Sequence, residues 1–186
     1  MTEREARLAA LVAQAEQGGS GLPPVDRWHP AHNGRIDIRI AVDGTWYHEG
    51  EPIRRDALVR VFSSILRRDD DGIVLVTPAE RLLIEVDDAP FMAVTVEQLT
   101  GEQGPRLLFT TLSGDAVIAG PEHRLWVELT EDGEPRPYLH VRGGLNARLH
   151  RNVFYQLVEW AQPREQDDET SLWVESDGAS FLLGTF

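Results

Sequence analysis

The sequence contains no cysteine and no lysine. Without cysteine, the chain has no disulfide, no thiolate metal ligand and no cysteine nucleophile. Without lysine, it has no amine for a Schiff base and no lysine general base. All 18 basic residues are arginines, whose planar guanidinium groups suit carboxylates and phosphates. Enzyme classes that depend on cysteine or lysine chemistry are therefore excluded.

Positive charge and long apolar runs are also scarce. The chain carries 18 basic and 31 acidic residues, a formal net charge of −13. Such a surface repels the phosphate backbone, so duplex DNA or RNA is not expected as the main partner, although clustered arginines can still bind one small anion. Apolar runs such as residues 73–76 fall far short of the roughly 20 residues that span a bilayer, and the first residues lack the apolar core of a signal peptide. We therefore expect a cytoplasmic protein without a membrane partner.

The rest of the composition is that of a globular protein. The chain has 186 residues, of which 41% are hydrophobic and 26% charged, and this suits one large domain or two small ones. An N-terminal helix is predicted over residues 1–17, because Thr2 and Glu5 have the spacing of a capping box and one helix face carries Leu8, Leu11, Val12 and Ala15. Residues 18–34, which begin Gly-Gly-Ser-Gly, are predicted to be a linker and lead-in.

Residues 35–100 are predicted to form a first unit of hairpin, helix and hairpin. Residues 36–40 alternate isoleucine with charged residues, which is typical of a strand with one wet face, and Asp43-Gly44 is a strong hairpin turn. A helix is predicted from the spacing of five apolar residues, and Arg67-Arg68 fall near its expected C-terminal end. These five residues are Leu58, Val61, Phe62, Ile65 and Leu66. Further strands are expected at 73–76, 82–86 and 91–97.

Residues 101–186 are predicted to form a second unit in the same order. After a strand at 106–112, strands are expected at 123–129 and 138–141, a helix at 146–161, an acidic loop at 163–170, and a hairpin of 172–174 with 181–183. Corresponding landmarks of the two units lie 89 to 98 residues apart, which indicates an internal duplication. Each unit is near the size at which a core becomes marginal, so the two are expected to pack together with a cleft at their interface. The predicted fold class is α+β, built from duplicated β-hairpin–helix–β-hairpin units.

Five motifs occur in order between residues 43 and 91, namely DGTW, GEPIRR, DDDG, VTPAE and VDDAPF. Together with Trp28-His29-Pro30 and the later stretch PYLHVRGGLNARLHRNVFYQLVEW, they make residues 28–160 closely resemble a bacterial family known as domain of unknown function 1285. The resemblance implies a duplicated core with a C-terminal half similar to a pleckstrin-homology fold. It also implies a nucleotide-like ligand between the halves and a part in signal transduction, including signalling under oxidative stress. It supplies no catalytic residue, and the acidic stretch PREQDDET is where this sequence is expected to depart from its relatives.

Four arginines beside the two expected helices are candidates for binding an anion. Arg54 and Arg55 precede the first helix, and Arg142 and Arg151 flank the start of the second. Guanidinium groups beside the free backbone N–H groups of a helix start can bind phosphate. Salt-bridged surface arginines are the alternative, and the sequence does not decide whether the four face one cleft.

Six further residues are candidates for contacting a planar, nucleotide-like ligand. Three are aromatic and suit stacking on a base, and three are polar and suit hydrogen bonds to ribose hydroxyls. The aromatic residues are Trp46, Tyr138 and Tyr155, and the polar ones are Thr77, Glu80 and Asp87. The alternatives are half-buried core aromatics and ordinary turn residues.

Signals for catalysis or for a metal are weak. The acidic runs at 69–71 and 167–169 lie in predicted loops, where solvation keeps carboxylates from acquiring the separated pKa values that acid–base catalysis needs. His29 and His32 lack the helix and the HExxH context of a zinc site, and no Walker, GxSxG or GxGxxG motif follows a predicted strand. No catalytic residue, metal or cofactor is therefore predicted.

Three functional hypotheses follow from the sequence. The first is a non-catalytic module that binds a small anionic, nucleotide-like ligand between the two units and acts in signal transduction. The second is a scaffold for protein–protein interaction, since an acidic surface suits a basic partner. The third is an unrecognised hydrolase, which would require acidic or histidine side chains to converge in the same cleft.

Overall fold

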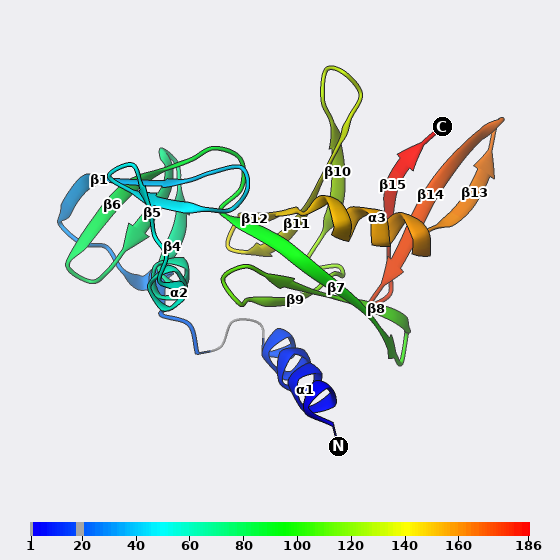
Figure 1. Cartoon of the computed structure of the whole chain (residues 1–186), viewed down its shortest axis with the longest axis horizontal. Helices are drawn as coiled ribbons and strands as arrows, with labels where there is room; N and C mark the ends of the chain where they lie inside the picture. Colours follow the sequence, from blue (N-terminus) through cyan, green and yellow to red (C-terminus); the bar gives the residue numbers. More distant parts are fainter. Residues whose placement is uncertain (1, 18–20) are drawn as a thin grey trace.

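The computed structural model describes residues 2–17 and 21–186 and has a mixed α+β fold dominated by strands (Figure 1). The α+β class is therefore confirmed. Residues 18–20, the glycine-rich part of the predicted linker, lie outside the described residues. Figure 1 shows the N-terminal sheet on the left, the C-terminal sheets on the right and the N-terminal helix below them.

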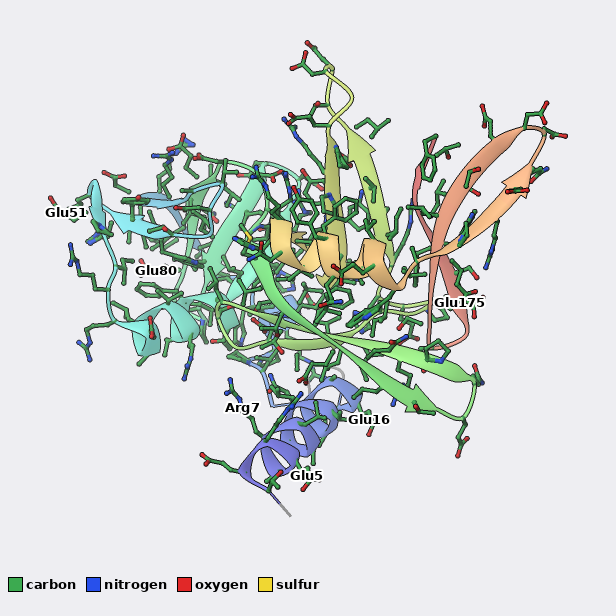
Figure 2. All side chains as sticks on the ribbon, turned by 45° about the vertical axis from the view of Figure 1, so that its right-hand side comes forward. Glu5, Arg7, Glu16, Glu51, Glu80 and Glu175 are labelled. Atoms are coloured by element: carbon green, nitrogen blue, oxygen red, sulfur yellow. The ribbon has the colours of Figure 1, made fainter. Side chains whose placement is uncertain are left out.

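The N-terminal helix, α1 (Glu3–Glu16), forms where the sequence predicts it. The backbone N–H of Glu5 donates to Thr2 Oγ1, and the backbone N–H of Thr2 donates to the Glu5 carboxylate, so the predicted capping box is confirmed. The apolar face of α1 is only half-buried and packs beside strand β9 (Ala116–Ile118). At its end Glu16, labelled in Figure 2, accepts from Arg106 at 3.0 Å. The helix is therefore held by a thin contact layer rather than by a buried core.

A single six-stranded sheet makes up the N-terminal half, with strand order β3-β2-β1-β6-β5-β4. Its strands and its helix are β1 (His32–Ile40), β2 (Trp46–His48), β3 (Glu51–Pro52), α2 (Asp56–Ser64), β4 (Leu66–Asp69), β5 (Gly72–Val76) and β6 (Glu80–Val86). A short 3₁₀ helix, η1 (Val25–Arg27), precedes them and lies against β4. All pairs are antiparallel except β1 with β6, which is parallel. This parallel ladder places the first and the last strand of the N-terminal half, β1 and β6, side by side.

The turn between β1 and β2 shows why glycine is needed there. Gly44 has a φ of +86°, which side chains rarely adopt, and an added Cβ would lie 2.8 Å from Leu112 Cδ1 and 3.0 Å from Met92 Cβ. The turn therefore packs closely on the C-terminal half as well as closing the predicted hairpin. On β1 the isoleucines alternate as expected, with Ile38 and Ile40 buried.

Two sheets make up the C-terminal half. The larger has strand order β10-β11-β12-β7-β8-β9, and the smaller has order β13-β14-β15. Their elements, besides β9, are β7 (Phe91–Gly101), β8 (Gly104–Thr111), β10 (Leu125–Leu129), β11 (Pro135–Arg142), β12 (Leu145–Leu149), α3 (Arg151–Trp160), β13 (Gln162–Gln166), β14 (Glu169–Ser176) and β15 (Ala179–Thr185). The predicted boundary between residues 100 and 101 falls at the end of β7. This strand pairs with β8 in an antiparallel ladder, in which Ala93 lies opposite Thr111 and Gly101 lies opposite Gly104.

One apolar core runs through both halves. It includes Ile40 and Trp46 from the N-terminal sheet, Phe109 and Leu139 from the larger C-terminal sheet, and Phe181 from the smaller one. Because these residues form one cluster, the two halves pack on each other, as the marginal size of each unit predicts. None of the helices in residues 2–17 and 21–186 has the length and apolar character needed to cross a bilayer.

Two predicted helices are shorter in the structure, and strands take the remaining residues. α2 ends at Ser64, so Leu66, Arg67 and Arg68 lie in β4, where they pair with β5 across the turn at Asp70-Asp71. The predicted helix over 146–161 begins only at residue 151, because 145–149 form β12. In β12, alternate residues are buried, and its ladders to β11 and β7 outweigh the helix propensity of leucine and alanine.

The predicted acidic loop over 163–170 is a hairpin of β13 and β14. Asp167 and Asp168 at its tip have φ values of 52° and 67°, the left-handed conformation that a two-residue hairpin turn requires. Aspartate tolerates this conformation better than most residues, because its short side chain can bond to nearby backbone. The prediction of an acidic loop from the charged composition was therefore wrong, because these residues form two paired strands.

The two halves share an order of elements but not a pattern of strand pairing. Three strands, a helix and three strands follow one another both in β1–β6 with α2 and in β10–β15 with α3. In the first set all six strands form one sheet, whereas in the second β10–β12 join β7 through a parallel ladder and β13–β15 form a separate sheet. The predicted duplication and the pleckstrin-homology likeness are therefore not confirmed, although the repeated order of elements agrees with the sequence spacing.

Candidate binding groove between the two halves

A groove runs along the junction of the two halves and the N-terminal segment. It consists of two adjoining cavities of about 270 Å³ and 280 Å³ that share Leu22 and Arg142 in their walls. We call it the seam groove. Its walls come from the end of α1, residues 21–26, β4, the turn before β9 and the β11–β12 turn. Apolar side chains such as Leu22, Leu66, Val117 and Val141 supply much of the lining.

Arg142 lies where the two cavities meet and bridges the two halves. Its NH1 group donates to Asp115 Oδ1 at 2.6 Å, and its NH2 group donates to the backbone carbonyl of Ser63 at 2.9 Å. The guanidinium carbon also lies 4.9 Å from the ring centroid of Phe91. A guanidinium group has five N–H donors. Because these bonds use only part of that capacity, Arg142 can still donate to a molecule in the groove.

Asp115 is held in place by its own turn. Its Oδ2 atom accepts from Ser113 Oγ at 2.7 Å and from Thr111 Oγ1 at 3.0 Å, while Oδ1 accepts from Arg142. The side chain is only 14% exposed. Both carboxylate oxygens are therefore occupied with orienting Arg142, which leaves Asp115 poorly placed to act as a base.

A second arginine attaches the lead-in segment to the N-terminal sheet. Arg67 forms two hydrogen bonds to Asp69 and donates through NH1 to the backbone carbonyls of Val25 and Trp28, at 2.8 and 2.7 Å. The hydrogen bond from Arg67, with a further one from Arg81, holds the pKa of the Asp69 carboxyl below its ordinary value of 3.8. Arg67 thus builds one wall of the groove and has little donor capacity left for a ligand.

His123 supplies a polar group at the other end of the groove. Because a carbonyl can only accept, its Nδ1 donates to the backbone carbonyl of His140, at 3.2 Å. The imidazole rings of His123 and His140 also stack, with their centroids 5.9 Å apart. Arginine and aspartate side chains balance in the walls, with Arg67 and Arg142 against Asp26 and Asp115. The groove is therefore locally neutral in a strongly acidic protein, and its arrangement suits a ligand with an apolar body and one anionic group.

Known protein families divide the chain at the connection between the halves. Residues 23–89 match the N-terminal domain, and residues 90–183 the C-terminal domain, of a family described as a domain of unknown function, DUF1285. The chain belongs to the DUF1285 family. The resemblance seen in the sequence motifs is thereby confirmed, and the family division gives a two-domain layout with β1–β6 in one domain and β7–β15 in the other.

Two crystal structures of DUF1285 family proteins are similar to this chain. The protein from Silicibacter pomeroyi DSS-3 is 45% identical, with a TM-score of 0.80, over 89% of this chain and 89% of that chain. The protein from Shewanella baltica OS155 is 28% identical, with a TM-score of 0.52, over 66% of this chain and 90% of that chain. No curated protein matches the chain.

In this DUF1285 protein, Arg142 is the predicted site residue that lines the seam groove. Arg54 and Arg55 are exposed beside α2, where Arg55 is the N-cap residue, and they do not line the groove. Arg151 is exposed at the start of α3 and lines a shallow depression together with His150. The structure therefore does not bring the four candidate arginines to one place.

The predicted aromatic residues are also dispersed. Trp46 is 4% exposed and stacks on Phe62 at 6.2 Å, so it is a core residue. Tyr155 is 56% exposed on the outer face of α3. At the turn between β5 and β6, Thr77 Oγ1 accepts from the backbone N–H of Glu80, while the Glu80 carboxylate lies 3.9 Å from His32. Trp46 is therefore an ordinary core residue, and Thr77 and Glu80 are ordinary turn residues.

Asp87 and Tyr138 each form contacts at or beside the connection between the domains, and neither lines the seam groove. Asp87 forms a bidentate ion pair with Arg39, and Tyr138 donates to Asp88 at 2.7 Å. Arg148 also donates to Asp88, at 2.9 Å, and lies over the Tyr138 ring. Burial raises the pKa of the Tyr138 phenol above its ordinary value of 10.0. Because each charge here has a partner within the chain, the cluster stabilises the domain connection.

Sequence reasoning missed most residues that build the seam groove. Asp115 had a local signal, since Thr111, Ser113 and Asp115 surround Gly114 in a pattern typical of a hydrogen-bonded turn. The sequence pattern predicts Arg67 near the end of a helix and Leu22 in a linker, so neither is expected at a site. No pattern along the chain links these positions, because their proximity arises from the packing of the two domains.

Proposed function

We propose that this DUF1285 protein is a non-catalytic module that binds a small organic anion in the seam groove. The single observation that carries the proposal is the position of Arg142, which lies at the junction of two cavities and retains donor capacity toward them. Ligand sites are typically concave and mostly apolar, with a few oriented polar groups, and the seam groove has this composition.

The chemistry of the walls favours a ligand of mononucleotide size. An apolar or planar body would lie against Leu22 and Val141, and a phosphate or carboxylate would meet Arg142. At the far end, the second ring nitrogen of His123 can form a further hydrogen bond with the ligand. A nucleotide-like anion fits this description, in agreement with the expectation from the sequence motifs.

A ligand in this position would touch both domains and the N-terminal segment, so its binding would couple their relative placement. This supports a role in signal transduction, where a bound molecule changes what a protein presents to a partner. We further propose that the two domains descend from one repeated unit, since the order of their elements repeats. A cytoplasmic location stays a prediction of the sequence.

Thermal unfolding in the presence of mono-, di- and cyclic nucleotides tests the proposal. A ligand at 100 times its Kd stabilises by about 2.7 kcal/mol, which raises the Tm by roughly 5–10 °C for a chain of this length. Leu22→Trp fills the groove without touching the Arg142 bonds and should abolish the shift. Leu112→Trp places the same side chain at a position that is 56% exposed outside the groove and should leave the shift unchanged.

An arginine pair gives a second control. Arg142→Lys keeps the positive charge but loses the forked donors, and should weaken any ligand-induced shift, whereas Arg55→Ala should not change it. The proposal fails if no nucleotide at millimolar concentration raises the Tm of the unmodified protein. It also fails if Leu22→Trp keeps the full shift, since the ligand would then bind elsewhere.

A further inference from the structure

The outer face of strands β7, β8 and β9 carries apolar residues that the main core does not cover. Leu107 and Phe109 of β8 belong to the apolar core that runs through both halves, so Leu108 between them faces the opposite side of the sheet. Its cross-strand partner on β9, Ile118, lies on that same outer face. Leu108 is 1% exposed and Ile118 is 7% exposed, although neither belongs to the main core. Another element of the chain must therefore cover them.

The element that covers this face is α1. It lies beside β9, and Figure 1 shows it below β8 and β9. Glu97, which is opposite Leu108 on β7, lies 4.0 Å from Arg4 near the start of the helix. Arg106, two residues before Leu108 and therefore on the same face of β8, pairs with Glu16 at the end of the helix. α1 thus runs across the outer face with its half-buried apolar side toward the two covered residues.

The contacts that hold α1 in place are few and exposed to water. No residue of α1 is buried. Within the described residues, its polar contacts with the rest of the chain are the two ion pairs and one hydrogen bond of 3.3 Å, from Gln14 to the carbonyl of Gly114. Ion pairs of exposed side chains contribute little, and Arg4 is 88% exposed. Residues 25–28, in contrast, are fixed to the N-terminal sheet by the two hydrogen bonds from Arg67, so α1 can leave while they stay.

α1 also forms one wall of the seam groove. Gln14 and Ala15, in its last turn, line the same cavity as Val141 and Arg142. Movement of α1 away from the sheet therefore opens this cavity. A ligand in the cavity contacts α1 only while the helix is in place, so a bound ligand stabilises the closed arrangement.

We propose that α1 is a detachable cover. It leaves the outer face as a unit while both domains stay folded, which opens the seam groove and exposes Leu108 and Ile118, and a ligand in the groove holds it closed. The effect of a ligand rests on the function proposed above, whereas the detachment itself does not. An empty groove is thereby linked to an exposed apolar surface and a filled groove to a covered one, a difference that a partner protein can recognise.

A single thiol beneath α1 measures the detachment, because the chain has no cysteine of its own. Ile118→Cys places the thiol under the helix, and Val174→Cys places it in the main core, at a position that is 4% exposed. The rate at which each thiol reacts with a maleimide reports how often that position becomes accessible. We expect Ile118→Cys to react at least about 100-fold faster than Val174→Cys, since only the latter requires the core to open.

Substitutions in α1 show whether its release exposes the thiol. Leu11→Gln removes a half-buried apolar side chain from the covering face and should speed the labelling of Ile118→Cys about fivefold. Arg7→Gln is the matched control at an exposed position and should change the rate less than twofold, because arginine, leucine and glutamine have similar helix propensities. Hydrogen exchange of the unmodified chain gives a second measurement that does not depend on the cysteine variants. The α1 amides should lose protection together, at urea concentrations where the β8 amides keep theirs.

AMP and cyclic AMP at millimolar concentration are the ligand probes. A nucleotide that raises the Tm should slow both the labelling of Ile118→Cys and the exchange of α1, by up to about 100-fold at 100 times its Kd. Equal labelling of the two thiols, no acceleration by Leu11→Gln, or loss of α1 protection only with that of β8 would overturn the detachable cover and leave the proposed function standing. A nucleotide that raises the Tm without slowing either rate would also overturn it. If no nucleotide raises the Tm, the proposed function fails, and the rates without ligand still decide whether α1 detaches.

Discussion

Replacing Arg142 tests whether the domain junction depends on this one side chain. Arg142→Met keeps an apolar stem of similar length but removes the ion pair with Asp115 and the hydrogen bond to the carbonyl of Ser63. Phe91, beneath the guanidinium group, keeps an apolar neighbour in the variant. The measured change in the free energy of unfolding should therefore come mainly from the polar contacts.

The magnitude follows from the exposure of the two charged side chains. Removing one partner of a fully buried ion pair costs about 3–5 kcal/mol, because the remaining charge is left unpaired. Asp115 is 14% and Arg142 24% exposed, so water lowers the cost for Asp115, while the lost bond to Ser63 adds about 1 kcal/mol. We expect a destabilisation of about 3 kcal/mol, or a fall in Tm of roughly 6–12 °C for a chain of this length.

Urea unfolding followed by tryptophan fluorescence and far-ultraviolet circular dichroism gives the free energy. Asp115→Asn and the double variant complete a thermodynamic cycle, in which the coupling between the two side chains should be about 1.5–3 kcal/mol. Arg4→Met, at a side chain that is 88% exposed, is the matched control and should cost less than about 0.5 kcal/mol. A loss of less than 0.5 kcal/mol for Arg142→Met, or additive effects of the two single variants, would refute this account of the junction.

Three further predictions follow from local contacts. The hydrogen bonds that lower the pKa of Asp69 contribute stability that is present above the ordinary carboxyl range and is lost as the pH falls through the lowered pKa. In Asp69→Asn, the urea midpoint should therefore fall less steeply as the pH drops below about 4. An unchanged pH profile would contradict this. Gly44→Ala should destabilise by more than about 2 kcal/mol, because its Cβ meets neighbouring side chains, whereas Gly50→Ala, with a φ of +82° but open space, should cost only about 1 kcal/mol by the same unfolding assay; equal costs would show that the close contact is relieved. Thr2→Ala removes a helix cap that contributes about 1 kcal/mol, so hydrogen exchange of the α1 amides should become about fivefold faster. The urea midpoint of the whole chain should stay unchanged, because α1 has no buried residue. A lower midpoint would mean that α1 unfolds together with the core.

Local patterns in the sequence were sufficient for many elements. The capping box at Thr2 and the hairpin turns at Asp43-Gly44, Asp132-Gly133 and Asp177-Gly178 involve residues only a few positions apart, so their energetics do not depend on distant parts of the chain. The alternation of residues 36–40 likewise identified β1. Motif order was sufficient for the family, because several motifs in a fixed order are specific even when each is short.

Elements whose bonding partners are distant were not predictable in this way. Leucine and alanine in residues 145–149 suit a helix, and only the ladders from β12 to β11 and to β7 make them a strand. A helix satisfies its backbone within itself, whereas a strand needs neighbours, and one of the two neighbours of β12, the strand β7, comes more than fifty residues earlier in the chain.

The candidate site shows the same division. The sequence by itself determined the charge balance, the absence of cysteine and lysine chemistry, and a short set of arginines able to meet an anion. Tertiary packing alone decided that Arg142 reaches a groove while Arg55 remains on the surface, and that Leu22, Arg67 and Asp115 complete the walls. The physical reason is that a side chain's chemistry belongs to its residue, but its exposure and its partners depend on which distant segments pack beside it.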